Sequence, residues 1–137
     1  MEIWIIKIEC AFGWYLDEKS AKICEIQNTY DLNSLCDFIL DSFEFDNDHL
    51  HEFFVAKQPR SIEKRILENE STMLQDIFPL AKNYALFMHF DFGDDWFFKI
   101  TRRLKQATFN NTHSYPRITE HIGKNPEQYP MCDEDEE

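Results

Sequence analysis

The chain has 137 residues, of which 43% are hydrophobic and 15% aromatic, and its 26 acidic against 14 basic side chains give a formal net charge of -12. This length predicts a single domain, and the apolar content is enough to build a core, which excludes a wholly disordered chain. No apolar run reaches the roughly 18 residues that cross a bilayer, and the start lacks the basic segment of an export signal, so we expect a cytoplasmic protein with no membrane partner.

The first part of the chain predicts a β-hairpin followed by a helix. Apolar side chains alternate through residues 2–12, which is typical of a strand, and a second short strand is expected at 22–27 after a charged turn. Asp31 is a good helix N-cap, and the apolar residues that follow recur at helical spacing. A helix from Leu32 to Phe43 or Phe45 is therefore expected to lay an apolar stripe on the sheet.

The remaining chain predicts a strand, an exposed connection and a second hairpin. Residues 49–56 alternate as a strand, and the charged residues 61–70 form either a short helix or a flexible connection. Ser71 or Thr72 is then expected to cap one helical turn. Aromatic-rich strands are expected at 83–90 and 95–105 around a turn. After Thr108 the composition becomes polar, which predicts an irregular arm lying over the sheet.

Together these elements predict an α+β fold, a single domain whose mixed or antiparallel sheet has one main helix packed on one face. The domain is expected to cover residues 1–132, and the acidic residues 133–137 are expected to form a solvated tail. No Gly-rich turn follows the first strand, which excludes a Rossmann fold.

Charge and cysteine spacing restrict the partners and cofactors. An acidic stretch without any Lys or Arg contains Asp37, Asp41, Glu44, Asp46, Asp48 and Glu52. Such a field repels phosphate backbones, so direct nucleic-acid binding is disfavoured. The cysteines lack a CxxC pair, which argues against zinc-finger and thioredoxin sites, and we expect Cys10, Cys24 and Cys36 to be reduced packing residues. We predict no cofactor.

Two histidines, His49 and His51, are separated by one residue and would point to the same side of a strand. That spacing can place two imidazoles on one metal ion. It is not the HExxH helix motif, however, and the preceding acidic residues lack the Gly and the distant Glu of a calcium loop. The alternative is a helix-to-strand turn in which one imidazole binds a backbone or carboxylate group.

Three carboxylates gather in the turn Asp91-Phe92-Gly93-Asp94-Asp95-Trp96. They repel one another unless they are hydrogen-bonded, paired, or neutralised by a cation. An Asx turn around Gly93 would explain them without a ligand, whereas hard-cation binding and partner recognition stay open. Ser and Cys residues occur, but none lies in a nucleophile signature, so we predict no catalytic residue.

These two segments together form the candidate functional patch, which consists of His49, His51, Glu52, Asp91, Asp94, Asp95 and Trp96. Within it, the side chains that could ligate a metal are His49, His51, Asp91 and Asp94. We assign no metal to them.

The same segments make the chain resemble the plasmid pRiA4b ORF-3-like family. The resemblance rests on Leu32-x-x-Leu35 through Phe43, Asp46-x-Asp48-His49-Leu50-His51-Glu52-Phe53, Phe90-Asp91-Phe92-Gly93-Asp94-Asp95-Trp96, and Tyr115-Pro116-Arg117 with Pro126-Glu127. It covers nearly the whole chain. It implies an α+β domain often found on mobile elements, and it implies no established activity.

Two departures from that family's pattern weigh against a shared metal or catalytic site. Phe98 stands where such sequences usually carry a His, so a site that recruited that imidazole has lost it. The usual PPED-Cys-Gly-Gly ending is reduced to Asn125-Pro126-Glu127-Gln128-Tyr129-Pro130.

Three functions follow as hypotheses. The leading one is a non-enzymatic protein-interaction domain with a protein partner, associated with a plasmid, phage or transposon. The second is a metal-dependent hydrolase or nuclease that uses His49, His51, Asp91, Asp94 and Asp95, which requires both segments to lie at one sheet edge. The third is an acidic decoy that imitates nucleic acid toward a basic protein, which requires Asp37, Asp41, Glu44, Asp46 and Asp48 to form one exposed row.

Overall fold

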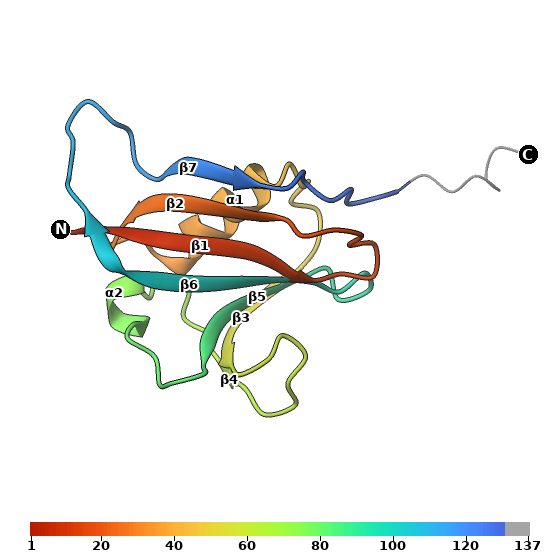
Figure 1. Ribbon diagram of the computed structural model, residues 1–137. Coiled ribbons are helices and arrows are strands. Elements are labelled where there is room, and N and C mark those ends of the chain that lie inside the picture. The colour runs from red at the N-terminus through yellow and green to blue at the C-terminus, as the bar shows by residue number, and fades with distance from the viewer. Residues whose placement is uncertain (131–137) are drawn as a thin grey trace, which may run out of the picture.

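A computed structural model describes residues 1–130 as one seven-stranded sheet, in which every strand is antiparallel to its neighbours (Figure 1). The strand order is β4-β3-β5-β6-β1-β2-β7. The strands are β1 (Ile3–Phe12), β2 (Ala21–Gln27), β3 (His51–Ala56), β4 (Arg65–Ile66), β5 (Ala85–Phe90), β6 (Trp96–Ala107) and β7 (Arg117–Ile122). The predicted acidic tail at 133–137 and the end of the predicted domain at 131–132 lie outside the described residues.

The expected α+β fold with one main helix packed on a sheet face is wrong, because the described chain is mostly an antiparallel β-sheet. Its helices are short: α1 (Leu32–Ser42) has 11 residues and α2 (Leu74–Ile77) has 4. Two strands went unrecognised because they lie at the sheet edges, where side chains stay in solvent and show no apolar alternation. β4 is exposed along its length, and β7 is at most half-buried.

The polar region after Thr108 is therefore not an irregular arm throughout. Its β7 strand pairs antiparallel with β2, so that Lys22 faces His121 across the pair. The α2 turn also differs from expectation, because its N-cap is Met73, which makes no side-chain capping bond. Neither helix is long and apolar enough to cross a membrane, as far as residues 1–130 are concerned.

The main core lies between the sheet and α1, which Figure 1 shows behind β1 and β2. Asp31 caps α1 as predicted, since its side chain accepts a hydrogen bond of 2.8 Å from the Ser34 amide. The helix contributes Leu32, Leu35, Cys36, Ile39 and Leu40 to this core. We call the sheet surface toward α1 the inner face and the opposite surface the outer face.

A second, smaller apolar cluster lies on the outer face. Phe54, Phe87 and Phe97 are buried there, on the face opposite to the one that α1 covers. The register of β1 with β6 shifts between Cys10 and Phe12, which places Cys10 in the main core and Phe12 against the outer cluster. The expected single apolar face of the first strand therefore ends at this irregularity.

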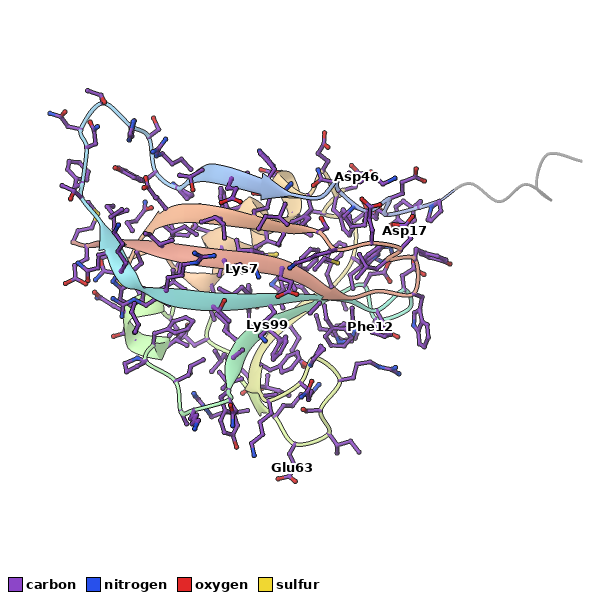
Figure 2. All side chains as sticks on the ribbon, viewed as in Figure 1. Lys7, Phe12, Asp17, Asp46, Glu63 and Lys99 are labelled. Atoms are coloured by element: carbon purple, nitrogen blue, oxygen red, sulfur yellow. The ribbon has the colours of Figure 1, made fainter. Side chains whose placement is uncertain are left out.

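Four loops that carry most of the predicted functional patch lie at one end of the sheet. The strand pairings bring together the ends of β1 and β5 and the starts of β2, β3 and β6. We call residues 13–20, 43–50, 91–95 and 123–130 the loop end, which lies at the right of Figure 1. Figure 2 labels Phe12, Asp17 and Asp46 on this side of the molecule.

Candidate functional site at the loop end

The acidic turn between β5 and β6 is organised by its first carboxylate. The Asp91 side chain accepts hydrogen bonds from the Gly93 and Asp94 amides at 3.1 and 3.2 Å, which is the Asx-turn arrangement. Asp91 and Asp95 themselves adopt left-handed backbone angles, with φ of 62° and 55°. The turn therefore holds its buried first carboxylate by backbone amides without a ligand.

His49 joins this turn to the C-terminal segment. Its Nε2 atom lies 2.8 Å from the Tyr129 hydroxyl, 3.3 Å from Asp91 Oδ2 and 3.7 Å from Asp48 Oδ1. The Tyr129 hydroxyl donates a bond of 2.7 Å to Asp48 Oδ2, so it accepts from the imidazole. Hydrogen bonds thus join His49, Tyr129 and Asp48 into one cluster, and Asp91 Oδ2 lies beside its imidazole.

Asp94 and Tyr129, two side chains in or beside this cluster, have raised pKa values, and burial is the largest cause of both shifts. Burial raises the pKa of Asp94, and repulsion from Asp91 adds to that effect. Burial and the hydrogen bond to Asp48 raise the pKa of Tyr129. Tyr129 therefore stays a neutral hydrogen-bond donor at physiological pH and is not activated as a nucleophile.

Two polar side chains, the buried Gln128 and the half-buried Asn125, fix the C-terminal segment that carries Tyr129. Gln128, 8% exposed, receives a bond of 2.7 Å from the Asp46 amide and donates to the Asp46 carbonyl and to Asp48 Oδ1. Asn125 accepts from the Lys22 ammonium at 2.5 Å and donates to Glu44 at 2.8 Å. Tyr129 is therefore presented by a segment that is held at two points.

Asp95 belongs to the outer side of the same turn. Its two carboxylate oxygens bind different partners, His89 Nε2 at 2.8 Å and the Trp14 indole at 3.1 Å. The His89 ring is stacked between Phe92 and Phe97, with centroid distances of 4.4 and 4.1 Å. Burial lowers the pKa of His89, and the bond to Asp95 opposes that shift.

The remaining members of the predicted patch lie elsewhere. His51 pairs with Glu70 at 2.8 Å, so it does not share a site with His49. Glu52 pairs with Lys64 at 3.2 Å, and Trp96 is fully buried in the main core. The structure thus brings together His49, Asp91 and Asp94, with Asp95 beside them.

The geometry meets one condition of the metal hypothesis, because His49 and the acidic turn lie at the same sheet edge. Among residues 1–130, however, no group of three or more His, Cys, Asp or Glu side chains is arranged to hold a metal ion. The acidic row of the decoy hypothesis is exposed in all five of its members, Asp37, Asp41, Glu44, Asp46 and Asp48.

Several large apolar side chains are exposed around this cluster. Trp14 is 58% exposed, Leu50 79%, Phe92 52% and Tyr129 51%. Tyr15, at 47%, lies on the same β1–β2 loop as Trp14 and lines a small hollow with Pro130. The loop end is therefore an acidic surface with five exposed apolar side chains.

Several of these residues could not be found from sequence patterns. Tyr129 and Gln128 fall in a segment expected to be irregular, and they contact Asp48 across 81 and 80 positions of the chain. Trp14 and His89 likewise meet through Asp95 only in the folded sheet. The one local signal was the pair Gly13-Trp14 in a predicted loop, where a large aromatic residue has no strand to pack in.

Comparison with known proteins identifies the family. The family described as plasmid pRiA4b ORF-3-like protein matches residues 17–129. The chain belongs to this family. The crystal structure of a protein of unknown function, MM3350 from Methanosarcina mazei Go1, superposes with a TM-score of 0.67 at 22% identity, over 88% of this chain and 69% of that one. At this identity the likeness shows a shared fold. No curated protein matches the chain.

Proposed function

We propose that this pRiA4b ORF-3-like protein is a non-enzymatic protein-interaction domain that binds a basic, partly apolar segment of a partner protein at its loop end. The observation that carries the proposal is the exposure of Trp14, Tyr15, Leu50, Phe92 and Tyr129 around one acidic turn. Exposed Trp and Tyr side chains are typical energetic centres of protein interfaces. Gathering five large apolar side chains in solvent is costly unless a partner covers them.

The negative charge of the loop end supports a partner segment that is positively charged. The chain carries a formal net charge of -12, and Asp48 and Asp94 lie within the exposed apolar group. In residues 1–130 no Lys or Arg forms an ion pair with either carboxylate. Such a field attracts Lys- and Arg-bearing segments and speeds their association.

The protonation of the cluster supports a binding role over a catalytic one. The Tyr129 hydroxyl has a raised pKa and is already engaged by His49 and Asp48. Burial also raises the pKa of the Cys10, Cys24 and Cys36 thiols to about 12, so these cysteines stay protonated and unreactive. These three free, buried thiols support placing the protein in the cytoplasm, and the plasmid in the family's description supports an association with mobile elements.

The proposal predicts binding to short basic peptides. A synthetic peptide of alternating Lys and Leu should bind the protein in calorimetry, with an affinity that falls as salt is added, whereas its Glu-Leu counterpart should not bind. Leu50→Ala and Phe92→Ala should each weaken binding by about fivefold or more, since interface anchors contribute about 1 kcal/mol or more.

Leu104 supplies the matched control, because it is 99% exposed on the far part of β6, away from the loop end. Leu104→Ala should leave the affinity unchanged. Equal binding of the Glu-Leu peptide, binding that ignores salt, or equal losses in all three variants would contradict the proposal.

A further inference from the structure

A pair of aromatic side chains on the outer side of the loop end surrounds an arginine of the chain itself. The Arg60 guanidinium lies 4.7 Å from the Phe12 ring centroid and 5.1 Å from that of Trp14. The two rings meet each other edge to face, at 5.1 Å and 80°. Two nearly perpendicular rings thus flank the Arg60 guanidinium, and aromatic faces attract such a cation.

The aromatic pair is held in place from below. The Trp14 indole donates to Asp95, which is itself bound to His89. Gly13, between the two rings, lies so close to the buried Trp96 ring that an added Cβ would be 2.4 Å from its Cε3 atom. The pair is therefore anchored to the core on one side and to the acidic turn on the other.

Arg60, in contrast, is weakly attached. It is exposed and comes from the irregular segment between β3 and β4, whose Lys64 lies over Phe54 of the outer cluster; Figure 2 labels Glu63 of that segment. Within residues 1–130 the guanidinium has no ion pair or hydrogen bond to a carboxylate. Exposed cation–π contacts are individually small, so a competing cation can replace this side chain.

We propose that Phe12 and Trp14, with Trp14 positioned by Asp95, form an arginine-binding subsite for a partner protein, which Arg60 occupies when the partner is absent. This inference rests on the proposed function, because it names the anchor of the basic segment that binds there. Trp14 belongs to the exposed apolar group, and the acidic surface around it attracts the same cation that the rings select. Arginine is preferred to lysine because its planar, weakly hydrated guanidinium can stack on one ring face while it stays within cation–π distance of the other ring.

The test follows Trp14 and Arg60 by NMR while an Arg-Leu peptide is added. Trp14 is the exposed tryptophan, since Trp4 and Trp96 are 4% and 0% exposed, so its indole signal can be assigned by Trp14→Phe. The indole signal of Trp14 should shift, and the Arg60 Nε signal should move to its free position with the same midpoint. The Lys-Leu peptide should produce a smaller displacement of Arg60.

Two variants complete the test. Arg60→Ala should bind the Arg-Leu peptide about twofold to fivefold more tightly, since exposed cation–π contacts of about 0.5–1 kcal/mol no longer compete. Trp14→Ala should lose the preference for the Arg-Leu over the Lys-Leu peptide. A thermal melt of each variant checks that it is folded.

The outcomes separate this inference from the proposed function. If both peptides bind in a Phe92-dependent way while Arg60 stays in place and Arg60→Ala changes nothing, the subsite is wrong and the interaction domain stands. If neither basic peptide binds the wild type or Arg60→Ala, both are wrong.

Discussion

At the scale of single residues, Gly13 packs against the buried Trp96 ring and so joins the exposed loop to the core. A Cβ on Gly13 would lie 2.4 and 2.6 Å from two ring carbons of Trp96, whose indole fills the core beneath Phe45. The neighbouring Phe12 and Trp14 depend on this close approach for their positions. The glycine is thus required by space, and no positive φ is involved.

Gly13→Ala should destabilise the protein by about 1–3 kcal/mol, because overpacking moves either the strand end or the buried indole. Urea unfolding measures this free energy. Gly93→Ala is the matched control, since its Cβ would meet only Asp91 Oδ1 at 3.5 Å, and it should change stability by less than about 0.5 kcal/mol. Equal losses in the two variants would show that the contact with Trp96 is not the cause.

At the scale of elements, the segment after β7 acts as a strap across the loop that follows α1. Gln128 connects it to both backbone groups of Asp46, and Asn125 connects it to Lys22 and Glu44. Lys22 is 2% exposed, and its ammonium also contacts His121 at 3.0 Å and the Phe43 ring at 5.0 Å. Because these hydrogen bonds hold the segment in place, Tyr129 lies within hydrogen-bond distance of His49.

Gln128→Ala should therefore detach Tyr129 from His49. Removing a buried side chain that satisfies two backbone groups costs about 1–3 kcal/mol. Hydrogen exchange should accelerate at the Asp46 amide, while amides in the centre of β1 keep their protection. Glu127→Ala, at an exposed neighbouring position, should leave exchange at Asp46 unchanged. If exchange at the Asp46 amide stayed slow in the Gln128 variant, the hydrogen bonds of Gln128 would not be what holds this segment in place.

At the scale of the whole molecule, net charge opposes folding and favours binding to cations. The formal net charge is -12, and Asp48, the last of the five exposed acidic residues that begin at Asp37, lies near Asp91 and Asp94 around Tyr129 and His49. Repulsion among these carboxylates destabilises the compact state, and dissolved salt screens it. Salt should therefore act in opposite directions on stability and on the binding of basic peptides.

The midpoint of thermal unfolding should rise by a few degrees as sodium chloride is raised from low to physiological concentration and above. Asp37→Asn with Asp41→Asn should raise the low-salt midpoint and reduce its salt dependence. The fraction of folded protein is followed by circular dichroism. A midpoint that falls with added salt would mean that ion pairs outweigh the repulsion.

Much of the sheet was predictable because its central strands alternate regularly. Local patterns of burial predicted the strands around Ile6, Cys24 and Phe98 and the capped helix after Asp31. The structure confirms these elements. The edge strands β4 and β7 were missed, since half-exposed strands carry no such pattern. This omission made the helix seem more important than it is and led to the wrong fold class.

In the candidate site, too, the features with a local sequence pattern were predictable and the long-range contacts were not. The sequence by itself determined that His49 and the turn at Asp91 carry unusual polar groups, because clustered carboxylates and paired histidines are visible in a few adjacent letters. Only the tertiary structure decided that His49 meets Tyr129 while His51 turns to Glu70, and that Trp14 encloses Arg60. These contacts join residues far apart in the chain, and the pairing of distant strands, which no local pattern encodes, brings them together.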